Sequence, residues 1–327
     1  MKNIVRWGIL GPGVIAHKFA QGLLLLKDAR LTAVASRSLE RAEDFARKYE
    51  MEKAFGSYEE LAACEDVDIV YVATPHPSHR ETALLCLKAG KAVLCEKPFT
   101  VNASQLEDMI LEARSSRVFL MEAMWTRFLP AMVQVREWLG KGLIGDVRMV
   151  KADFGFRSGW NPEERLLNPQ LGGGALLDVG IYVVSLVSMI LGPSPVKVES
   201  MAYIGKTGVD EQFSALLGYE EGKIANVSAA VRTNLPGEAW VIGTQGKIRI
   251  PAFWCAKSAS LMVDGQEDVE FTSDSEGAGY HYEAQEAMNC LREGKLESSV
   301  IPLDESLEIM KLLDTIRSQW GLKYPFE

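Results

Sequence analysis

The feature that most constrains this chain is a glycine-rich turn set between an apolar run and a helical pattern. The run at 4–10 predicts a buried strand, and the spacing of apolar residues over 14–26 predicts a helix. Gly11 permits a tight turn, Gly13 lets backbone approach a ligand, and Ala16 lets the helix pack closely on the strand. This pattern is typical of a turn that binds the pyrophosphate of a dinucleotide.

The start of the predicted helix supplies the groups that an anion needs. Val14 and Ile15 open the helix after Gly13, so their N–H groups have no partner within the helix. The positive end of the helix dipole lies there as well, and it favours phosphate. The alternative interpretation is an ordinary glycine-rich turn that binds nothing.

Strands and helices alternate over residues 1–122, which predicts a parallel, doubly wound Rossmann sheet. In such a sheet the loops after the strands share one edge, where ligands bind. The predicted strands are 4–10, 31–35, 69–73, 92–95 and 118–121, and the predicted helices are 14–26, 39–49, 78–89 and 102–114.

From residue 123 to 327 the pattern changes to α+β with one large, mainly antiparallel open sheet. Helices on one face of that sheet leave the other face available for a partner. The segment 243–247 is expected to be a hairpin between strands. The predicted strands are 147–155, 196–204, 211–219, 223–231, 239–243, 246–250, 260–263 and 267–271, and the predicted helices lie near 130–141, 175–191, 280–293 and 304–319.

Composition excludes several classes of function. A formal net charge of -9 disfavours a nucleic-acid partner, and 47% hydrophobic residues supply two cores. The five cysteines are scattered, which indicates reduced thiols in the cytoplasm, and we expect no signal peptide. We expect no membrane span, because no apolar run in the sequence approaches the required length. We expect no metal, because the four histidines make no metal-binding spacing.

The end of the second strand bears on which dinucleotide binds. Sites specific for NAD place an acid there to bind the ribose 2′-hydroxyl. This chain has Ser36 and Arg37 instead, and a guanidinium suits a 2′-phosphate. We therefore expect NADP as the preferred cofactor with NAD possible, while the alternative for Arg37 is a solvated charge.

Two further segments carry candidate chemistry. Lys97 follows Glu96 at the end of a predicted strand, where an ammonium can stabilise a developing alkoxide; a surface lysine is the alternative. Gly172-Gly173-Gly174 precede a predicted helix, so we expect the backbone to pass close to a ligand there. Asp178 and Tyr182 are four residues apart on that helix, and together they offer a proton relay. The alternative is that Asp178 only caps a helix and that Tyr182 is a half-buried tyrosine without a catalytic role.

Aromatic and basic residues are candidates for a substrate pocket. Aromatic faces stack on the apolar side of sugar or diol rings, and arginines bind hydroxyls or anions; core aromatics and solvated charges are the alternatives. The candidates are Trp125, Phe154, Trp160, Tyr280, Arg127 and Arg157.

Taken together, the N-terminal turn, Glu96-Lys97-Pro98 and the run 172–182 resemble the Gfo/Idh/MocA oxidoreductase family over nearly the whole chain. Residues 124–128 and Tyr182 resemble a branch of that family that acts on diols and D-xylose. Members that act on inositol carry His where this chain has Tyr182, so an inositol substrate is not expected.

The resemblance implies hydride transfer between the nicotinamide and a hydroxyl-bearing carbon of a sugar, polyol or trans-diol. It implies that Lys97 lies beside the nicotinamide, Tyr182 is the general acid/base and Asp178 positions the substrate. It also implies a cis peptide before Pro98 and a homodimer or homotetramer built through the C-terminal sheet. The residues implied to contact the cofactor are Thr74, Pro75, His76, His79, Glu96 and Lys97.

Two other functions remain open at this point. One is a reductase of a non-sugar carbonyl or C=C substrate. The other is a non-catalytic NADP-binding regulator on the same fold, which would keep Gly11–Ala16 without needing Lys97 and Tyr182.

Overall fold

The computed structural model describes residues 4–274 and 276–327 and divides the chain into two compact units. The first unit runs to Trp125 and also takes in Glu276–Ser306, while the second holds the described residues of 126–275 and Leu307–Glu327. This division groups Glu276–Ser306 with the first unit, whereas the sequence pattern predicts a contiguous division at residue 122.

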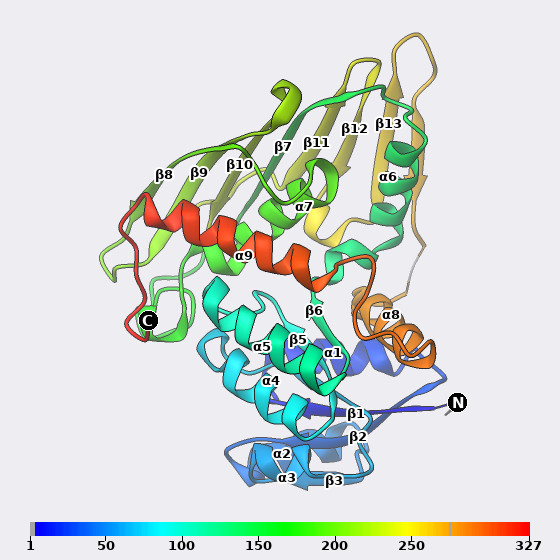
Figure 1. Ribbon diagram of the computed structural model, residues 1–327, viewed down its shortest axis with the longest axis vertical. Coiled ribbons are helices and arrows are strands. Elements are labelled where there is room, and N and C mark those ends of the chain that lie inside the picture. Colours follow the sequence, from blue (N-terminus) through cyan, green and yellow to red (C-terminus); the bar gives the residue numbers. More distant parts are fainter. Residues whose placement is uncertain (1–3, 275) are drawn as a thin grey trace. The chain divides into compact units, whose positions relative to one another are not determined.

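The first unit contains a six-stranded sheet in the order β3-β2-β1-β4-β5-β6, and every pair of neighbours is parallel. This confirms the doubly wound Rossmann sheet (Figure 1). The order reverses between β1 and β4, which is where a doubly wound sheet opens a crevice for a ligand. Its strands are β1 Val5–Leu10, β2 Ala29–Ala35, β3 Lys53–Phe55, β4 Ile69–Val72, β5 Ala92–Glu96 and β6 Leu120–Ala123.

Some helices of the first unit begin where a short polar side chain caps them. Ser38 accepts a hydrogen bond from the N–H of Arg41, and Asn102 does the same for Gln105. The short β3 and α3 were not predicted, because β3 is a half-exposed edge strand with no buried apolar run. The helices are α1 Val14–Leu23, α2 Leu39–Lys48, α3 Tyr58–Ala62, α4 His79–Lys88, α5 Ala103–Ser116 and α8 Tyr280–Arg292.

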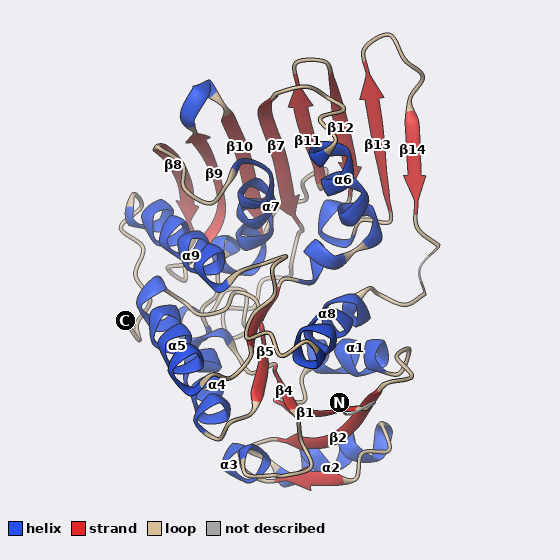
Figure 2. Ribbon diagram, turned by 45° about the vertical axis from the view of Figure 1, so that its right-hand side comes forward, coloured by secondary structure: helices blue, strands red, loops and turns tan. Residues whose placement is uncertain are grey.

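The second unit contains an eight-stranded sheet in the order β14-β13-β12-β11-β7-β10-β9-β8 (Figure 2). Its pairs are antiparallel except that β10 runs parallel to β7. The expected hairpin is confirmed, since β11 ends at Gly243 and β12 begins at Gly246. The strands are β7 Val147–Gly155, β8 Lys197–Ile204, β9 Asp210–Gly218, β10 Ile224–Ala230, β11 Glu238–Gly243, β12 Gly246–Pro251, β13 Ser258–Val263 and β14 Val269–Thr272.

Helices cover one face of this second sheet. The helix α7 (Ile181–Leu191) packs on β7 and β10, and α6 (Pro130–Gly140) packs on β13 and β14 (Figure 2). Burial alternates along β9, with Phe213, Ala215 and Leu217 turned to the helices. The opposite face is open and carries exposed apolar side chains, among them Met201, Tyr203, Leu216 and Ile224. A further helix, α9 (Leu303–Ser318), begins in the first unit and continues in the second.

One helical stretch corrects the expectation about apolar length. Pro169–Leu191 is 23 residues long and apolar enough to cross a membrane by length and composition. Its most apolar window is 83% buried inside the structure, which is the property of a core helix. Within it, Leu176–Gly180 forms a π-helical turn directly before α7. Such turns are frequent at functional sites because they widen the helix locally.

Candidate active site

The glycine-rich turn lies at the point where the first sheet reverses its order. Gly11 has φ +84°, and a Cβ at this position would lie 2.9 Å from the carbonyl oxygen of Ala73 at the end of β4. No described atom lies within 4 Å of the Cβ position at Gly13, so the backbone is open there to a ligand. Both observations fit a pyrophosphate cradle, since a side chain at Gly11 would be strained and one at Gly13 would fill the cradle.

The N-terminus of α1 completes this cradle. No side chain caps the helix, and its first turn contains no acidic residue. Val14 is 78% exposed, Ile15 is half-buried, and Ala16 is buried against the sheet. The free N–H groups and the helix dipole therefore present positive partial charge to an anion at this end.

Ser36 and Arg37 follow β2 along the same edge. Ser36 is buried, and its Oγ accepts a hydrogen bond from the N–H of Ser38 at 3.2 Å. Arg37 is exposed, and no described carboxylate forms an ion pair with it. The position that would hold an acid in an NAD-specific site therefore holds a serine and a guanidinium.

The histidine at 79 joins two loops of this edge. Its ring is fully buried, with Nε2 2.8 Å from the carbonyl oxygen of Thr74 and Nδ1 2.9 Å from that of Pro98. Burial lowers the pKa of His79, although the hydrogen bonds to backbone carbonyls favour its charged form. His79 thus ties the loop after β4 to the loop after β5, and His76 lies against it at 5.7 Å between ring centroids.

The strand β5 ends at Glu96, and the next peptide, Lys97–Pro98, is cis as the family resemblance implied. Glu96 accepts a hydrogen bond from the hydroxyl of Tyr71 and another from the N–H of Lys97. Lys97 itself is half-buried. These contacts fix the turn that carries the lysine at the ligand-binding edge of the sheet.

Sequence reasoning missed Glu283, which lies on α8 in the returning segment. Its side chain is fully buried, and neither carboxyl oxygen has a hydrogen-bond partner in the described part of the chain. Burial, and next the Glu96 carboxylate, raise the pKa of Glu283 well above its usual range. No motif marked it, because α8 reaches the Rossmann unit only through tertiary packing.

The helix α8 also carries a predicted pocket residue. Tyr280 stacks on Trp125 with 4.5 Å between ring centroids and 26° between planes. Gly22 on α1 permits the approach of α8, since a Cβ there would lie 3.0 Å from the N of His281. Two of the predicted aromatic side chains therefore pack on each other within the first unit.

The remaining predicted catalytic residues belong to the second unit. Asp178 lies in the π-helical turn, is 5% exposed, and forms an ion pair with Arg165 at 2.6 Å. Tyr182 lies in the first turn of α7, with its ring edge-on to Phe154 at 5.5 Å between centroids. Arg165 was not predicted, because nothing in its charged loop distinguishes it from a solvated arginine.

Aromatic packing around Tyr182 extends to a residue that sequence reasoning missed. Trp254 stacks on Phe154 with 4.0 Å between centroids and 9° between planes. Its main-chain oxygen accepts a hydrogen bond from Thr126 at 2.9 Å. Tyr182 therefore lies beside a flat aromatic pair, a surface that suits the apolar face of a ring.

Arg127 and Trp160, also predicted for the pocket, lie in different environments of the second unit. Arg127 is 3% exposed, and its guanidinium donates to the Oγ of Ser185 at 3.1 Å and to its carbonyl oxygen at 2.8 Å. It thereby holds α7 one turn after Tyr182. Trp160 is 51% exposed and lies over the guanidinium of Arg232.

The glycine run before Asp178 makes room for protein groups. A Cβ at Gly173 would lie 2.6 Å from the carbonyl oxygen of Arg165, and one at Gly174, where φ is +117°, would overlap the carboxylate of Asp210. The expectation that this backbone passes close to a ligand is thus replaced by close packing on the chain itself. The hydroxyl of Tyr324 donates a hydrogen bond to the carbonyl oxygen of Gly173 at 2.9 Å, which also fixes the glycine run.

Asp210 positions the helix that carries both candidate residues. Its Oδ2 accepts a hydrogen bond from the N–H of Leu176 at 2.6 Å, and its side chain is fully buried. It therefore caps from β9 the helical segment that contains Asp178 and Tyr182. Burial raises the pKa of Asp210 to about 7, although backbone N–H groups favour its charged form.

Two other properties bear on the chemistry. Within residues 4–274 and 276–327, no group of three or more His, Cys, Asp or Glu side chains is placed to hold a metal ion. All five cysteines are free thiols, and all but Cys255 are buried.

Sequence comparison finds two matching family descriptions. Residues 5–124 match the oxidoreductase family with an NAD-binding Rossmann fold, and residues 132–249 match the Gfo/Idh/MocA C-terminal domain. Trans-1,2-dihydrobenzene-1,2-diol dehydrogenase from Mus musculus is 44% identical over 332 residues, which is 98% of each chain. The enzyme of that name from Homo sapiens is 40% identical over 98% of each chain.

Solved structures give the same picture. An aldose-aldose oxidoreductase from Caulobacter crescentus, complexed with glycerol, has a TM-score of 0.86 and 25% identity, over 97% of this chain and 98% of that one. A 3-ketoreductase from Actinomadura kijaniata, in complex with NADP and TDP-benzene, has a TM-score of 0.85 and 25% identity, with the same coverage.

We predict that Asp210→Asn changes the pH dependence of folding. Because the pKa of Asp210 rises from 3.8 to about 7 on folding, the folded chain binds this proton more tightly than the unfolded chain. The stability that this proton contributes is present below pH 3.8 and is lost as pH rises to about 7. Asparagine can still accept a hydrogen bond from the N–H of Leu176 but does not ionise. Relative to wild type, the free energy of unfolding of the variant should therefore rise by on the order of a few kcal/mol across that pH window.

Urea denaturation at a series of pH values spanning 3.8 to about 7 measures this difference. Asp264→Asn is the matched control, because it removes an exposed carboxylate from a turn of the same unit. A stability difference between wild type and Asp210→Asn that stays constant with pH would contradict the assignment.

Proposed function

The chain belongs to the Gfo/Idh/MocA oxidoreductase family, and from this we propose that it oxidises a trans-diol with NADP as its preferred cofactor. It is an NAD(P)-dependent oxidoreductase that transfers a hydride between the nicotinamide and a CH–OH carbon. The observation that carries the diol proposal is the flat pair of Phe154 and Trp254 beside Tyr182. A cyclic diol presents an apolar ring face to such a surface and hydroxyls at its edge. Relatives that are 40% and 44% identical are named for a diol of this kind.

Each proposed catalytic residue has a separate role in the oxidation. The turn at Gly11–Gly13 and the start of α1 would hold the dinucleotide, which when bound would supply the acceptor for the hydride. Lys97 stabilises the negative charge that develops on the substrate oxygen, and Tyr182 takes part in removal of the hydroxyl proton. Asp178 accepts a hydrogen bond from a substrate hydroxyl, with its carboxylate oriented by Arg165. In the reverse direction the same groups return the proton to a carbonyl oxygen.

Replacing Lys97 tests this assignment. Lys97→Ala should leave NADP affinity within a few fold of wild type and lower kcat for a trans-diol about a hundredfold or more, because charge stabilisation in the transition state is lost. Turnover is followed by the absorbance of the reduced nicotinamide, and affinity by fluorescence titration. Lys88→Ala removes a lysine from the end of α4 as a control. Unchanged turnover in Lys97→Ala would rule out the role given to this residue.

The preference for NADP is proposed from Ser36 and Arg37. A guanidinium pairs with a 2′-phosphate through charge-assisted hydrogen bonds, whereas the end of β2 offers no carboxylate to a 2′-hydroxyl. Arg37→Ala should therefore raise the Kd for NADP about tenfold or more and change the Kd for NAD little.

Paired titrations of NADP and NAD against wild type and Arg37→Ala measure this. Arg47→Ala, which removes an arginine from the far end of α2, is the control. An equal rise in the Kd for both cofactors in Arg37→Ala, or tighter binding of NAD than of NADP by wild type, would contradict the preference.

We also propose that the protein is a cytoplasmic homodimer or homotetramer that associates through the open face of the second sheet. Met201, Leu216 and Ile224 are 79%, 52% and 42% exposed on neighbouring strands of that face. Sedimentation velocity should show an oligomer in wild type that dissociates in Leu216→Lys, while Leu111→Lys on α5 leaves it intact. A monomeric wild type would refute the association, and recovery outside the cytosolic fraction of cells would refute the compartment.

A further inference from the structure

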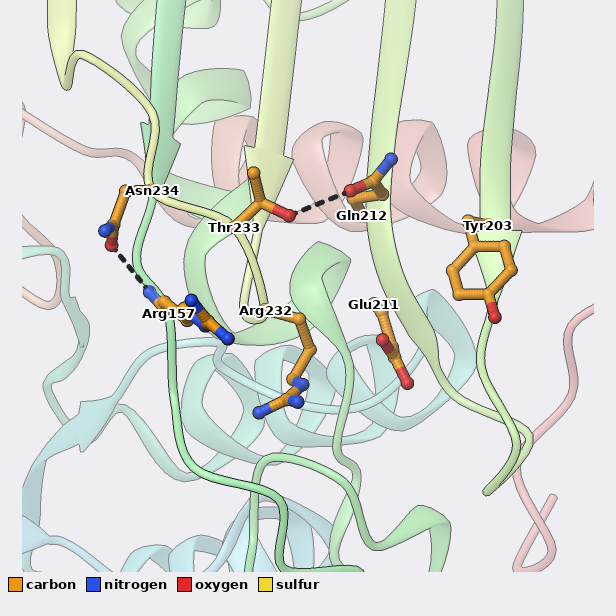
Figure 3. A pocket seen from close by; sticks show the side chains of 7 residues that line it. All are labelled: Arg157, Tyr203, Glu211, Gln212, Arg232, Thr233 and Asn234. Carbon is orange, nitrogen blue, oxygen red and sulfur yellow. Dashed lines mark hydrogen bonds between the residues drawn. The ribbon is translucent and has the colours of Figure 1, made fainter.

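A polar hollow of about 650 Å³ lies at one end of the open face of the second sheet (Figure 3). It gathers side chains from the end of β8, from the start of β9 and from the segments that follow β7 and β10. Its lining residues are Arg157, Tyr203, Glu211, Gln212, Arg232, Thr233 and Asn234. None of them has a role in the proposed oxidation.

Two of these residues place like charges directly opposite each other. Arg157 and Arg232 form an isolated antiparallel bridge, so their side chains leave neighbouring backbones on the same face. In the described part of the chain neither guanidinium forms an ion pair with a carboxylate. The contacts of the Arg232 guanidinium are the carbonyl oxygen of Ser158 and the ring of Trp160. Opposed like charges destabilise a strand pair unless an anion compensates them.

The other groups in the hollow add hydrogen-bond donors. The Oδ1 of Asn234 accepts from the N–H of Arg157 at 2.8 Å, and the Oε1 of Gln212 accepts from the hydroxyl of Thr233 at 3.2 Å (Figure 3). Because both amide oxygens are engaged, each amide offers its NH₂ group to a ligand. Glu211 is the single carboxylate among the lining residues. The hollow is therefore locally positive on a chain whose net charge is -9.

We propose that this hollow binds the phosphate group of a small molecule, held between the guanidinium groups of Arg157 and Arg232. Guanidinium donors match the oxygens of a phosphate in pairs, and the amide donors complete its coordination. Free phosphate and a phosphorylated sugar share this chemistry. The proposal is independent of the oxidation described above, because it rests on residues of the second unit alone and is tested by binding.

The test is calorimetric titration of the NADP-saturated protein, so that phosphate sites for the cofactor are already filled. The titrants are inorganic phosphate, glucose 6-phosphate and glucose. We expect saturable binding of both phosphates and no binding of glucose at this site. Equal affinity for the two phosphates indicates that the phosphate alone is recognised, and tighter binding of the sugar phosphate indicates that the sugar contributes.

Substitution of the arginines locates the site. The double variant Arg157→Gln/Arg232→Gln should raise the Kd for phosphate about tenfold or more. Arg→Lys at both positions should give an intermediate Kd, because lysine keeps the charge but loses the paired donors. Arg148→Gln on β7, where the native arginine pairs with Asp146, is the control and should bind as wild type does.

Two results would overturn the proposal. One is the absence of saturable phosphate binding by wild type. The other is equal phosphate affinity in wild type and in the double Gln variant. If that variant alters sedimentation while phosphate affinity is unchanged, the arginines contact a second copy of the chain, and the proposal is wrong.

Discussion

The close approach of two backbones at the middle of the Rossmann sheet is the constraint on which the first unit depends. Gly11 passes so near Ala73 that a side chain would strain the turn, and this closeness sets where β1 ends and α1 begins. Because all six strands are parallel, the loops after them meet at one edge. Ser36, Thr74 and Lys97 reach that edge for the same reason, although they are far apart in sequence.

In the second unit, buried polar contacts hold the helical segment with the proposed catalytic residues Asp178 and Tyr182 on an open sheet. Asp210 reaches from β9 to the start of the helical segment, and glycine at 174 leaves room for its carboxylate. The guanidinium of Arg127 donates hydrogen bonds to the Oγ and the carbonyl oxygen of Ser185, which lies on the same helical segment. Asp178 and Tyr182 are thus fixed by neighbours that do no chemistry of their own, as a preorganised site requires.

Much of this could be predicted, because apolar runs and helical spacing report local burial. The Rossmann strands and the antiparallel strands followed from such patterns, as did the placement of Lys97 after a strand and of Tyr182 on a helix. The catalytic roles proposed for these two residues rest on the family resemblance. Trp254, Arg165 and Asp210 could not be found that way, since each acts through a partner brought near only by tertiary folding. Glu283 was missed because only tertiary packing buries it. The glycine run before Asp178 was found but misinterpreted, because sequence shows that space is needed and not which group fills it.

The most direct test of hydride transfer traces a deuterium label from the substrate carbon to the nicotinamide. Wild-type protein, NADP and trans-1,2-dihydrobenzene-1,2-diol deuterated at the CH–OH carbons are incubated together, and the cofactor is analysed by mass spectrometry. Deuterium is expected in the reduced nicotinamide, because the hydride passes directly from carbon to cofactor. Cofactor that stays oxidised, or reduced cofactor without deuterium, would contradict it.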